Sequence, residues 1–257
     1  MRRYSILHPL FMSFFSKSLY QDIARNWPGL CFTYLFSVLA LCAIPGVLKF
    51  QSEFSYIINR EAPKYVRQLP AITIEKGKVS IDKPEPYFIS DEKTGAHWAV
   101  IDTTGGITSL EGSKAVLLLT KTSLIVKSDD RESRTLDLSG IDNLVVDRSS
   151  MYTILESLED WVAVFVYPFA VIFSFLYRVI EVLILALMGT LIAKTVKTSL
   201  DYRTLVRLAS VSITPVLICG AFLVLAGAEV PYWPLASFIL SLAYLFFAIK
   251  ANVGSPA

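Results

Sequence analysis

The chain has 257 residues, of which 54% are hydrophobic and only 18% charged, and its mean hydropathy is +0.53. Soluble domains contain about 45–50% apolar and about 25% charged residues. A soluble fold of this composition would leave apolar surface uncovered, so the composition indicates an integral membrane protein and excludes a cytosolic enzyme.

The charges are distributed unevenly along the chain. Residues 50–160 carry 13 Lys and Arg against 18 Asp and Glu, whereas the rest of the chain carries 11 basic and four acidic residues. Basic loops stay in the cytoplasm, so an acidic block inside a basic, apolar framework is expected outside it. The basic residues are scattered among apolar segments, which excludes a nucleic-acid-binding surface.

Residues 1–28 form a basic N-terminal segment in which Asp22 is the only acid, so we expect this end in the cytoplasm. Phe11, Phe15, Leu19 and Ile23 recur every fourth residue and predict an amphipathic helix. Two positions fit it: on the inner leaflet, which we favour, or packed against the membrane spans.

The first membrane span is expected over residues 29–49, since Gly29 to Leu48 is uncharged and Lys49 closes the run. The next apolar region, residues 161–193, is too long for one perpendicular crossing. Either one long or broken helix, interrupted at Pro168, or two spans joined near residues 177–181 would account for it. The basic connector that follows favours one crossing.

The last spans are expected over residues 205–227 and 232–250 within a C-terminal bundle of residues 159–257. Their connector contains Glu229, no basic residue, and the aromatic pair Tyr232 and Trp233, which suits the outer interface. The favoured fold class is thus an α-helical membrane bundle of four spans, with five as the alternative, carrying an inserted β-rich domain.

Residues 50–158 are the part of the chain that is able to form a water-soluble domain. After a helical stretch that follows the first span, short runs of alternating apolar residues between turn residues predict six to eight strands. These runs are Ile72–Ile74, Val79–Ile81, Tyr87–Ile89, Trp98–Ile101, Ala115–Leu119, Leu124–Val126, Leu136–Leu138 and Leu144–Val146. We therefore expect a small extracytoplasmic β-rich domain.

Catalytic signals in this domain are weak. His97 and Asp102 are its one close histidine–carboxylate pair, and no nucleophile elbow accompanies them. The remaining histidine, His8, belongs to the opposite side of the membrane, which argues against a histidine metal site. We expect no catalytic residue, no metal and no cofactor, and a non-enzymatic protein.

Arg178 and Glu181 are the candidate intramembrane pair. They are three residues apart, lie on one helical face and are able to pair with each other. Charge inside a membrane is costly and often functional, but a pair at the outer interface is equally a structural feature.

The chain resembles the DUF1189 family of bacterial multispanning membrane proteins. The resemblance rests on Ser18-Leu19-Tyr20, Lys76-Gly77-Lys78, Pro86-Tyr87, the turn Asp102-Thr103-Thr104-Gly105, Leu119-Thr120-Lys121, and Tyr202, Arg207 and Pro215. It implies the same architecture, a bacterial inner-membrane location and a distant similarity to Yip-type membrane proteins, which are linked to trafficking and scaffolding. It supplies no catalytic residues.

Two functions follow from these patterns. The leading hypothesis is an accessory or scaffold protein in the lipid bilayer whose extracytoplasmic domain binds a membrane or periplasmic protein partner. The alternative is a transporter or permease-associated subunit that uses Arg178 and Glu181.

Overall fold

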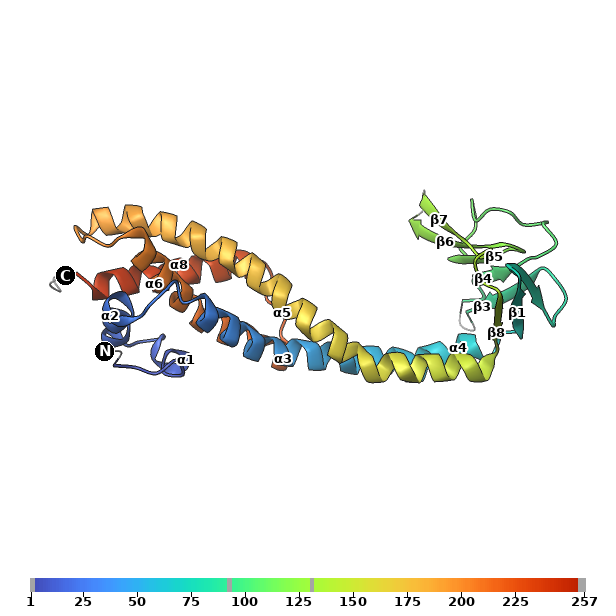
Figure 1. Cartoon of the computed structure of the whole chain (residues 1–257), viewed down its shortest axis with the longest axis horizontal. Coiled ribbons are helices and arrows are strands. Elements are labelled where there is room, and N and C mark those ends of the chain that lie inside the picture. The colour runs from blue at the N-terminus through green and yellow to red at the C-terminus, as the bar shows by residue number, and fades with distance from the viewer. Residues whose placement is uncertain (1–2, 92–93, 130–131, 254–257) are drawn as a thin grey trace. The chain divides into compact units, whose positions relative to one another are not determined.

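The computed structural model describes residues 3–91, 94–129 and 132–253. The chain divides into two compact units (Figure 1): a helical unit, made of the residues up to Gln51 and those from Val162 on, and a β unit, Ser52–Trp161. A helical bundle with a β-rich domain is therefore the correct coarse description of the fold.

The helical unit contains long apolar helices and two short ones near the N-terminus. Its helices are α1 (Pro9–Met12), α2 (Lys17–Asn26), α6 (Tyr202–Ser212), α7 (Thr214–Leu225), α8 (Trp233–Ala251) and most of α3 (Phe32–Tyr56) and α5 (Arg148–Thr195), whose last and first turns, respectively, belong to the β unit. Four described helical stretches are long and apolar enough to cross a membrane: Phe32–Val66, Arg148–Thr195, Tyr202–Leu225 and Trp233–Ala251.

The region that posed two alternatives, residues 161–193, is part of one continuous helix, α5, and no turn interrupts it at residues 177–181. The stretch expected as a single span over residues 205–227 is divided at Ile213 into α6 and α7. Pro215 has no N–H to donate to Val211, which explains why the helical hydrogen bonding is interrupted here.

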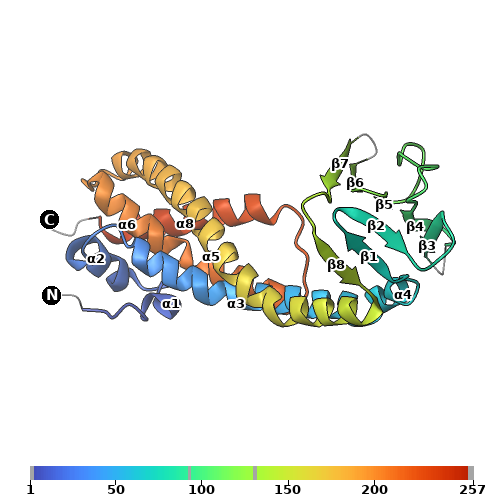
Figure 2. The same ribbon diagram turned by 45° about the vertical axis from the view of Figure 1, so that its right-hand side comes forward.

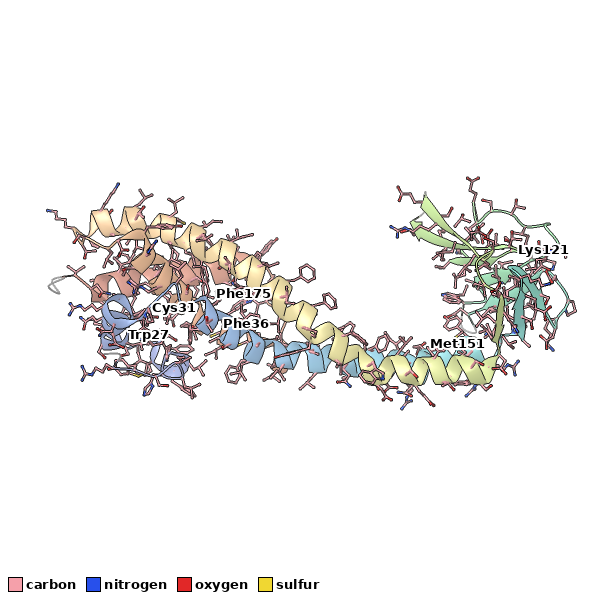
Figure 3. All side chains as sticks on the ribbon, viewed as in Figure 1. Trp27, Cys31, Phe36, Lys121, Met151 and Phe175 are labelled. Carbon is pink, nitrogen blue, oxygen red and sulfur yellow. The ribbon has the colours of Figure 1, made fainter. Side chains whose placement is uncertain are left out.

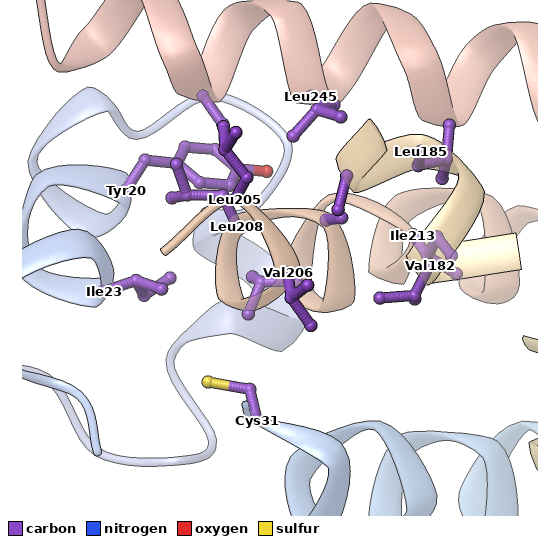
Figure 4. Close-up of a cluster of buried hydrophobic side chains, with 14 of the residues drawn as sticks. Tyr20, Ile23, Cys31, Val182, Leu185, Leu205, Val206, Leu208, Ile213 and Leu245 are labelled. Atoms are coloured by element: carbon purple, nitrogen blue, oxygen red, sulfur yellow. The ribbon is translucent and has the colours of Figure 1, made fainter. Parts of the chain in front are cut away.

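The core of the helical unit is built around α6, where eight of eleven residues are buried. Leu205 and Leu208 of α6 pack with Tyr20 of α2 and Leu245 of α8 in one apolar cluster (Figure 4). Aromatic rings add a second contact, since Phe36 of α3 meets Phe175 of α5 edge to face at 5.4 Å between ring centroids (Figure 3).

Helix α5 has one buried face and one exposed face, and both are apolar. Val182, Leu185, Ala186, Gly189 and Ala193 recur at helical spacing and are buried, whereas the large apolar residues between them are exposed, among them Leu183, Ile184, Leu187 and Leu191. A helix that exposes so many large apolar side chains is unusual for a soluble monomer and compatible with a lipid environment.

The N-terminal segment differs from the favoured expectation. Ser16 caps α2 by accepting the Leu19 N–H at 3.3 Å, so the apolar stripe is divided between two short helices. Leu19 and Ile23 are fully buried in the bundle core, whereas Phe11 and Phe15 are 76% and 70% exposed. For α2, packing against other helices is the correct interpretation; the exposed residues lie before it.

The β unit contains eight strands in two sheets. They are β1 (Ile72–Glu75), β2 (Lys78–Ile81), β3 (Tyr87–Ser90), β4 (His97–Ile101), β5 (Leu117–Leu119), β6 (Ser123–Asp129), β7 (Glu132–Asp137) and β8 (Asn143–Val146). One sheet has the order β2-β1-β8, as Figure 2 shows, and the other β3-β4-β5-β6-β7. Each predicted apolar run overlaps one strand.

Two features of the β unit do not follow from the alternation of apolar residues: the parallel pairing of two strands and the buried crossover that joins them. β4 and β5 pair in parallel, with Val100 opposite Leu118, so the intervening chain must cross over. Leu118 is fully buried and Val100 nearly so, and Leu110 and Ala115 of the crossover pack with them. The crossover thus supplies part of the core.

The polypeptide before β1 continues α3 into a π-helical turn, η1 (Ile57–Glu61), and a short helix, α4 (Ala62–Val66). Pro63, the second residue of α4, has no N–H, so the regular hydrogen-bond pattern cannot pass through this position, and a change of helix type here is expected. This helical end forms one wall of the groove described below.

Candidate functional site

An apolar groove of about 330 Å³ lies in the β unit. It is formed by η1, α4, strands β3 and β4 and the first turns of α5. Its apolar walls include Ile57, Val66, Ile89, Trp98, Met151 and Leu155. Val66 and Ile89 are buried, whereas Ile57 and Trp98 are 52% and 38% exposed, so part of the groove wall is accessible to a ligand.

Hydrogen bonds hold the groove in shape. The Gln68 side-chain amide donates to the Ser90 carbonyl at 2.8 Å and accepts the Ser90 N–H at 2.9 Å. The Tyr87 hydroxyl donates to the Gln68 carbonyl at 2.8 Å. These bonds attach the chain after α4 to β3. They also provide hydrogen-bond partners for backbone groups of β3, which is an edge strand and would otherwise leave them unpaired.

The aromatic face of the groove is the pair Tyr65 and Trp98, whose ring centroids lie 5.2 Å apart. The Tyr65 hydroxyl donates to Asp91 Oδ2 at 3.0 Å, which fixes the ring. Glu61 lies at the rim and pairs with Lys64 at 2.5 Å. Aromatic side chains beside an apolar pocket are typical of the centres of protein interfaces.

The predicted turn at Asp102 is a structural unit. Asp102 is 1% exposed; its Oδ1 accepts from the Thr104 N–H at 2.9 Å and hydroxyl at 2.5 Å, and its Oδ2 accepts from the Ile107 N–H at 2.5 Å. The Thr104 hydroxyl bond, with these backbone bonds, holds the pKa of Asp102 below its usual value against the effect of burial. The neighbouring Thr103 donates its backbone N–H and its hydroxyl to the Glu85 carboxylate. Gly105 completes the turn in a left-handed conformation, with φ +88°.

His97 has a different partner from the one that its place in the sequence suggested. Its Nδ1 lies 2.9 Å from the Ser90 hydroxyl, and its ring stacks near Phe88 at 4.5 Å, while the Asp102 oxygens are engaged in their own turn. Among residues 3–91, 94–129 and 132–253, no three His, Cys, Asp or Glu side chains form a group suited to a metal ion.

Arg178 and Glu181 form the predicted pair inside the helical unit. Arg178 Nη1 donates to Glu181 Oε2 at 2.5 Å, and the two side chains are only 16% and 5% exposed. The guanidinium carbon also lies 5.5 Å from the centre of the Tyr177 ring. The pair lies among packed helices, where Val182 next to it is fully buried.

A second polar cluster in the helical unit was missed by the sequence analysis. Asp22 is 5% exposed and accepts from the backbone of Arg3 and Tyr4, from Asn26 Nδ2 at 2.7 Å and from Trp27 Nε1 at 3.0 Å. Burial raises the pKa of Asp22, but these hydrogen bonds outweigh it and leave the pKa below its usual value. The signal available in the sequence was a lone acid in a basic segment.

Arg207 joins this cluster from α6. Its guanidinium donates to the carbonyl oxygens of Trp27 and Ala24 and to the Thr204 hydroxyl. A cation on a central helix thus binds the carbonyls where α2 ends. Arg207 and Asp22 together fix the connection between α2 and α3, which is a structural role.

Two comparisons with known proteins find relatives of this chain. The family model described as "Protein of unknown function (DUF1189)" matches residues 7–249. An uncharacterized protein of Rickettsia prowazekii (strain Madrid E), RP489, is 25% identical over 134 residues, which are 47% of this chain and 45% of that protein. The chain thus spans less than half the length of this curated relative.

No solved structure matches the chain, and the distant similarity to Yip-type proteins stays a prediction. The family match covers nearly the whole sequence, including both the helical unit and the β unit. The chain therefore belongs to the DUF1189 family.

Proposed function

We propose that this protein is a multi-pass protein of the bacterial inner membrane that acts as a non-enzymatic accessory or scaffold protein. In this proposal the N-terminus is cytoplasmic, residues 50–158 are extracytoplasmic, and the β unit binds a protein partner. The observation that carries the proposal is the open apolar groove beside Tyr65 and Trp98, which is held in shape by hydrogen bonds from Gln68.

The chemistry of the groove favours one kind of partner. Its walls suit a large apolar side chain as an anchor, because burying such a side chain contributes about 1.5–3 kcal/mol. Carboxylates lie near it: Glu61 lines the groove and pairs with Lys64, Asp91 accepts the Tyr65 hydroxyl, and the exposed Glu156 follows Leu155 in the sequence of α5. We therefore propose a partner segment with an apolar anchor flanked by Lys or Arg, since opposite charge speeds and orients association.

Site-specific photo-crosslinking in native membranes tests this proposal. A photoreactive residue in place of Met151 should form one discrete protein adduct, because Met151 lines the groove. Leu155→Lys should reduce that adduct at least tenfold by placing a cation where the apolar anchor and basic flanks would bind.

Leu136→Lys is the matched control, since Leu136 is 55% exposed on β7 and lies outside the groove. It should leave the adduct unchanged. Lipid adducts alone at Met151, or equal loss of the protein adduct in both variants, would contradict the proposal.

Transport, or a role beside a permease, is the second candidate function. It is supported by the burial of Arg178 and Glu181 among helices, since charged groups inside a membrane bundle often belong to a substrate pathway. A double variant, Arg178→Gln with Glu181→Gln, removes both charges with little change of shape. A flux or growth phenotype that survives this variant unchanged would remove the support for transport.

A further inference from the structure

A second cavity, of about 290 Å³, lies in the helical unit and is independent of the proposed docking groove. Leu39 and Gly46 of α3, Val216 and Val224 of α7, and Trp233 at the start of α8 form much of its wall. It opens on the surface of the bundle and is not an enclosed void. Its volume is just below the range for small-ligand pockets, which is about 300–1,000 Å³, and suits a small polar group.

The polar groups in this wall all have a hydrogen to donate, and two of them, the Arg178 guanidinium and the Trp233 indole, are donors alone. Arg178, Ser174 and Trp233 line the cavity. The structure gives the Arg178 guanidinium one hydrogen-bond acceptor within the described chain, Glu181, although it has five N–H groups. The Trp233 ring stands against Gly220, where a Cβ atom would lie 3.6 Å from Nε1. The cavity therefore offers donors to a ligand that carries acceptor oxygens.

The charge balance of the cavity indicates which net charge a bound ligand should have. Glu181 compensates the Arg178 charge through Oε2, and its buried Oε1 has no hydrogen-bond partner among the described residues. The pair is thus neutral overall, with no surplus of positive charge. Adding a net charge to an apolar, membrane-embedded site is costly, so the site favours a ligand that has acceptor oxygens but no net charge.

We propose that this cavity binds the zwitterionic head of a phospholipid, with a phosphate oxygen accepting hydrogen bonds from Arg178 and Trp233. The apolar chains remain outside the cavity, along the surface where Phe222 and Leu225 are 65% and 66% exposed. The positive end of the head balances its own phosphate, so the site stays neutral. Trp233 lines the cavity and belongs to the aromatic pair expected at the outer interface, which is the depth at which lipid heads lie.

Native mass spectrometry of the purified, delipidated full-length protein tests this inference. Dioleoylphosphatidylethanolamine and dioleoylphosphatidylcholine are the zwitterionic probes, dioleoylphosphatidylglycerol is the anionic probe, and inorganic phosphate is the probe without chains. We expect at least tenfold tighter binding of a zwitterionic lipid than of the glycerol lipid, and no competition by phosphate. Comparison of the two zwitterionic lipids shows whether the ammonium hydrogens contribute.

Two variants leave the ion pair intact. A Cβ at Gly46 would have no neighbour within 4 Å, so Gly46→Leu starts a bulky side chain in the cavity wall without a clash at Cβ and should abolish binding. Trp233→Phe keeps the ring and removes the N–H, and should weaken binding about two- to tenfold. Ser37→Leu and Tyr232→Phe are the controls, because both residues are exposed and lie outside the cavity wall.

Binding that is unchanged in both Gly46→Leu and Trp233→Phe would overturn the inference. Equal or tighter binding of the anionic lipid would overturn the charge argument on which it rests. The crosslinking experiment on the β unit does not depend on either outcome, so the two proposals fail separately.

Discussion

Gly77 is a residue at which two constraints coincide. It follows Lys76 in the two-residue turn between β1 and β2, and both have positive φ, +46° and +74°, as the favoured hairpin turn requires. In addition, a Cβ at Gly77 would lie 2.6 Å from the Ser139 Cα. Glycine is needed here both for the backbone conformation and for the close approach of another segment.

We therefore predict that Gly77→Ala lowers the free energy of unfolding by more than the roughly 1–2 kcal/mol expected of a left-handed conformation alone. Gly95→Ala is the matched control, since Gly95 has φ +66° and open space around its Cβ position. Thermal unfolding of the full-length protein in detergent measures both. Equal destabilisation by the two variants would show that the contact with Ser139 contributes nothing.

Helix α5 begins at Arg148, well before the apolar region that predicted it. The reason lies in Asp147, which accepts from the Ser150 N–H and from the Ser149 and Ser150 hydroxyls, each at 2.8 Å. These bonds, the Ser150 N–H first, lower the pKa of Asp147 to about 2. The polar residues after Arg148 concealed this helical start from a search for apolar runs.

We predict that this helical start weakens in acid. Because the pKa of Asp147 is lower in the folded protein than its usual value of about 3.9, its stabilising effect is complete above about pH 4 and is lost as the pH falls toward about 2. Hydrogen exchange at the Met151 amide, which donates to the Asp147 carbonyl, measures it. Asp147→Ala should expose this amide at pH 6 and have little effect at pH 2; equal effects at both would contradict the prediction.

Helix α2 is a core element because its apolar face is covered by other helices of the bundle. Ile23 is fully buried, and Tyr20 beside it donates its hydroxyl to the Ser13 carbonyl at 2.7 Å. Burial raises the pKa of Tyr20. The helical period of the sequence identified the apolar face, but it did not identify what covers that face.

We predict that Ile23→Ala destabilises the protein by about 2–5 kcal/mol, since it leaves a cavity in a packed core. Phe11→Ala removes a larger side chain that is 76% exposed and should change the unfolding temperature in detergent little. A comparable effect of both substitutions would mean that α2 and the preceding segment share one environment.

At the scale of the whole molecule, local periodicity predicted much of the secondary structure. The long apolar runs correspond to helices and the short alternating runs to strands. Both patterns depend only on residues that are close together in the sequence. The parallel pairing of β4 with β5 was not predictable in this way, since it joins strands separated by a buried crossover. The division of the strands into two sheets depends on the same kind of non-local contact.

The same difference between local and non-local features separates the candidate sites that the sequence predicted from those that it did not. Arg178 and Glu181 were found because charge is rare in apolar sequence and their spacing is helical. The groove beside Trp98 was not found, since it is assembled from α4, β3, β4 and α5, which are far apart in the sequence. The cluster of Asp22 and Arg207 likewise joins residues 185 positions apart, counted from 22 to 207.

The central claim is that the chain crosses the membrane with the β unit outside and the connector after α5 inside. Labelling of single introduced cysteines with a membrane-impermeant thiol reagent tests it in intact spheroplasts, with the unsubstituted protein as background control. Lys83 in the β unit and Lys197 after α5 are both exposed. Lys83→Cys should label in intact spheroplasts and Lys197→Cys only after permeabilisation. Labelling of Lys197→Cys from outside, or protection of Lys83→Cys, would contradict the claim.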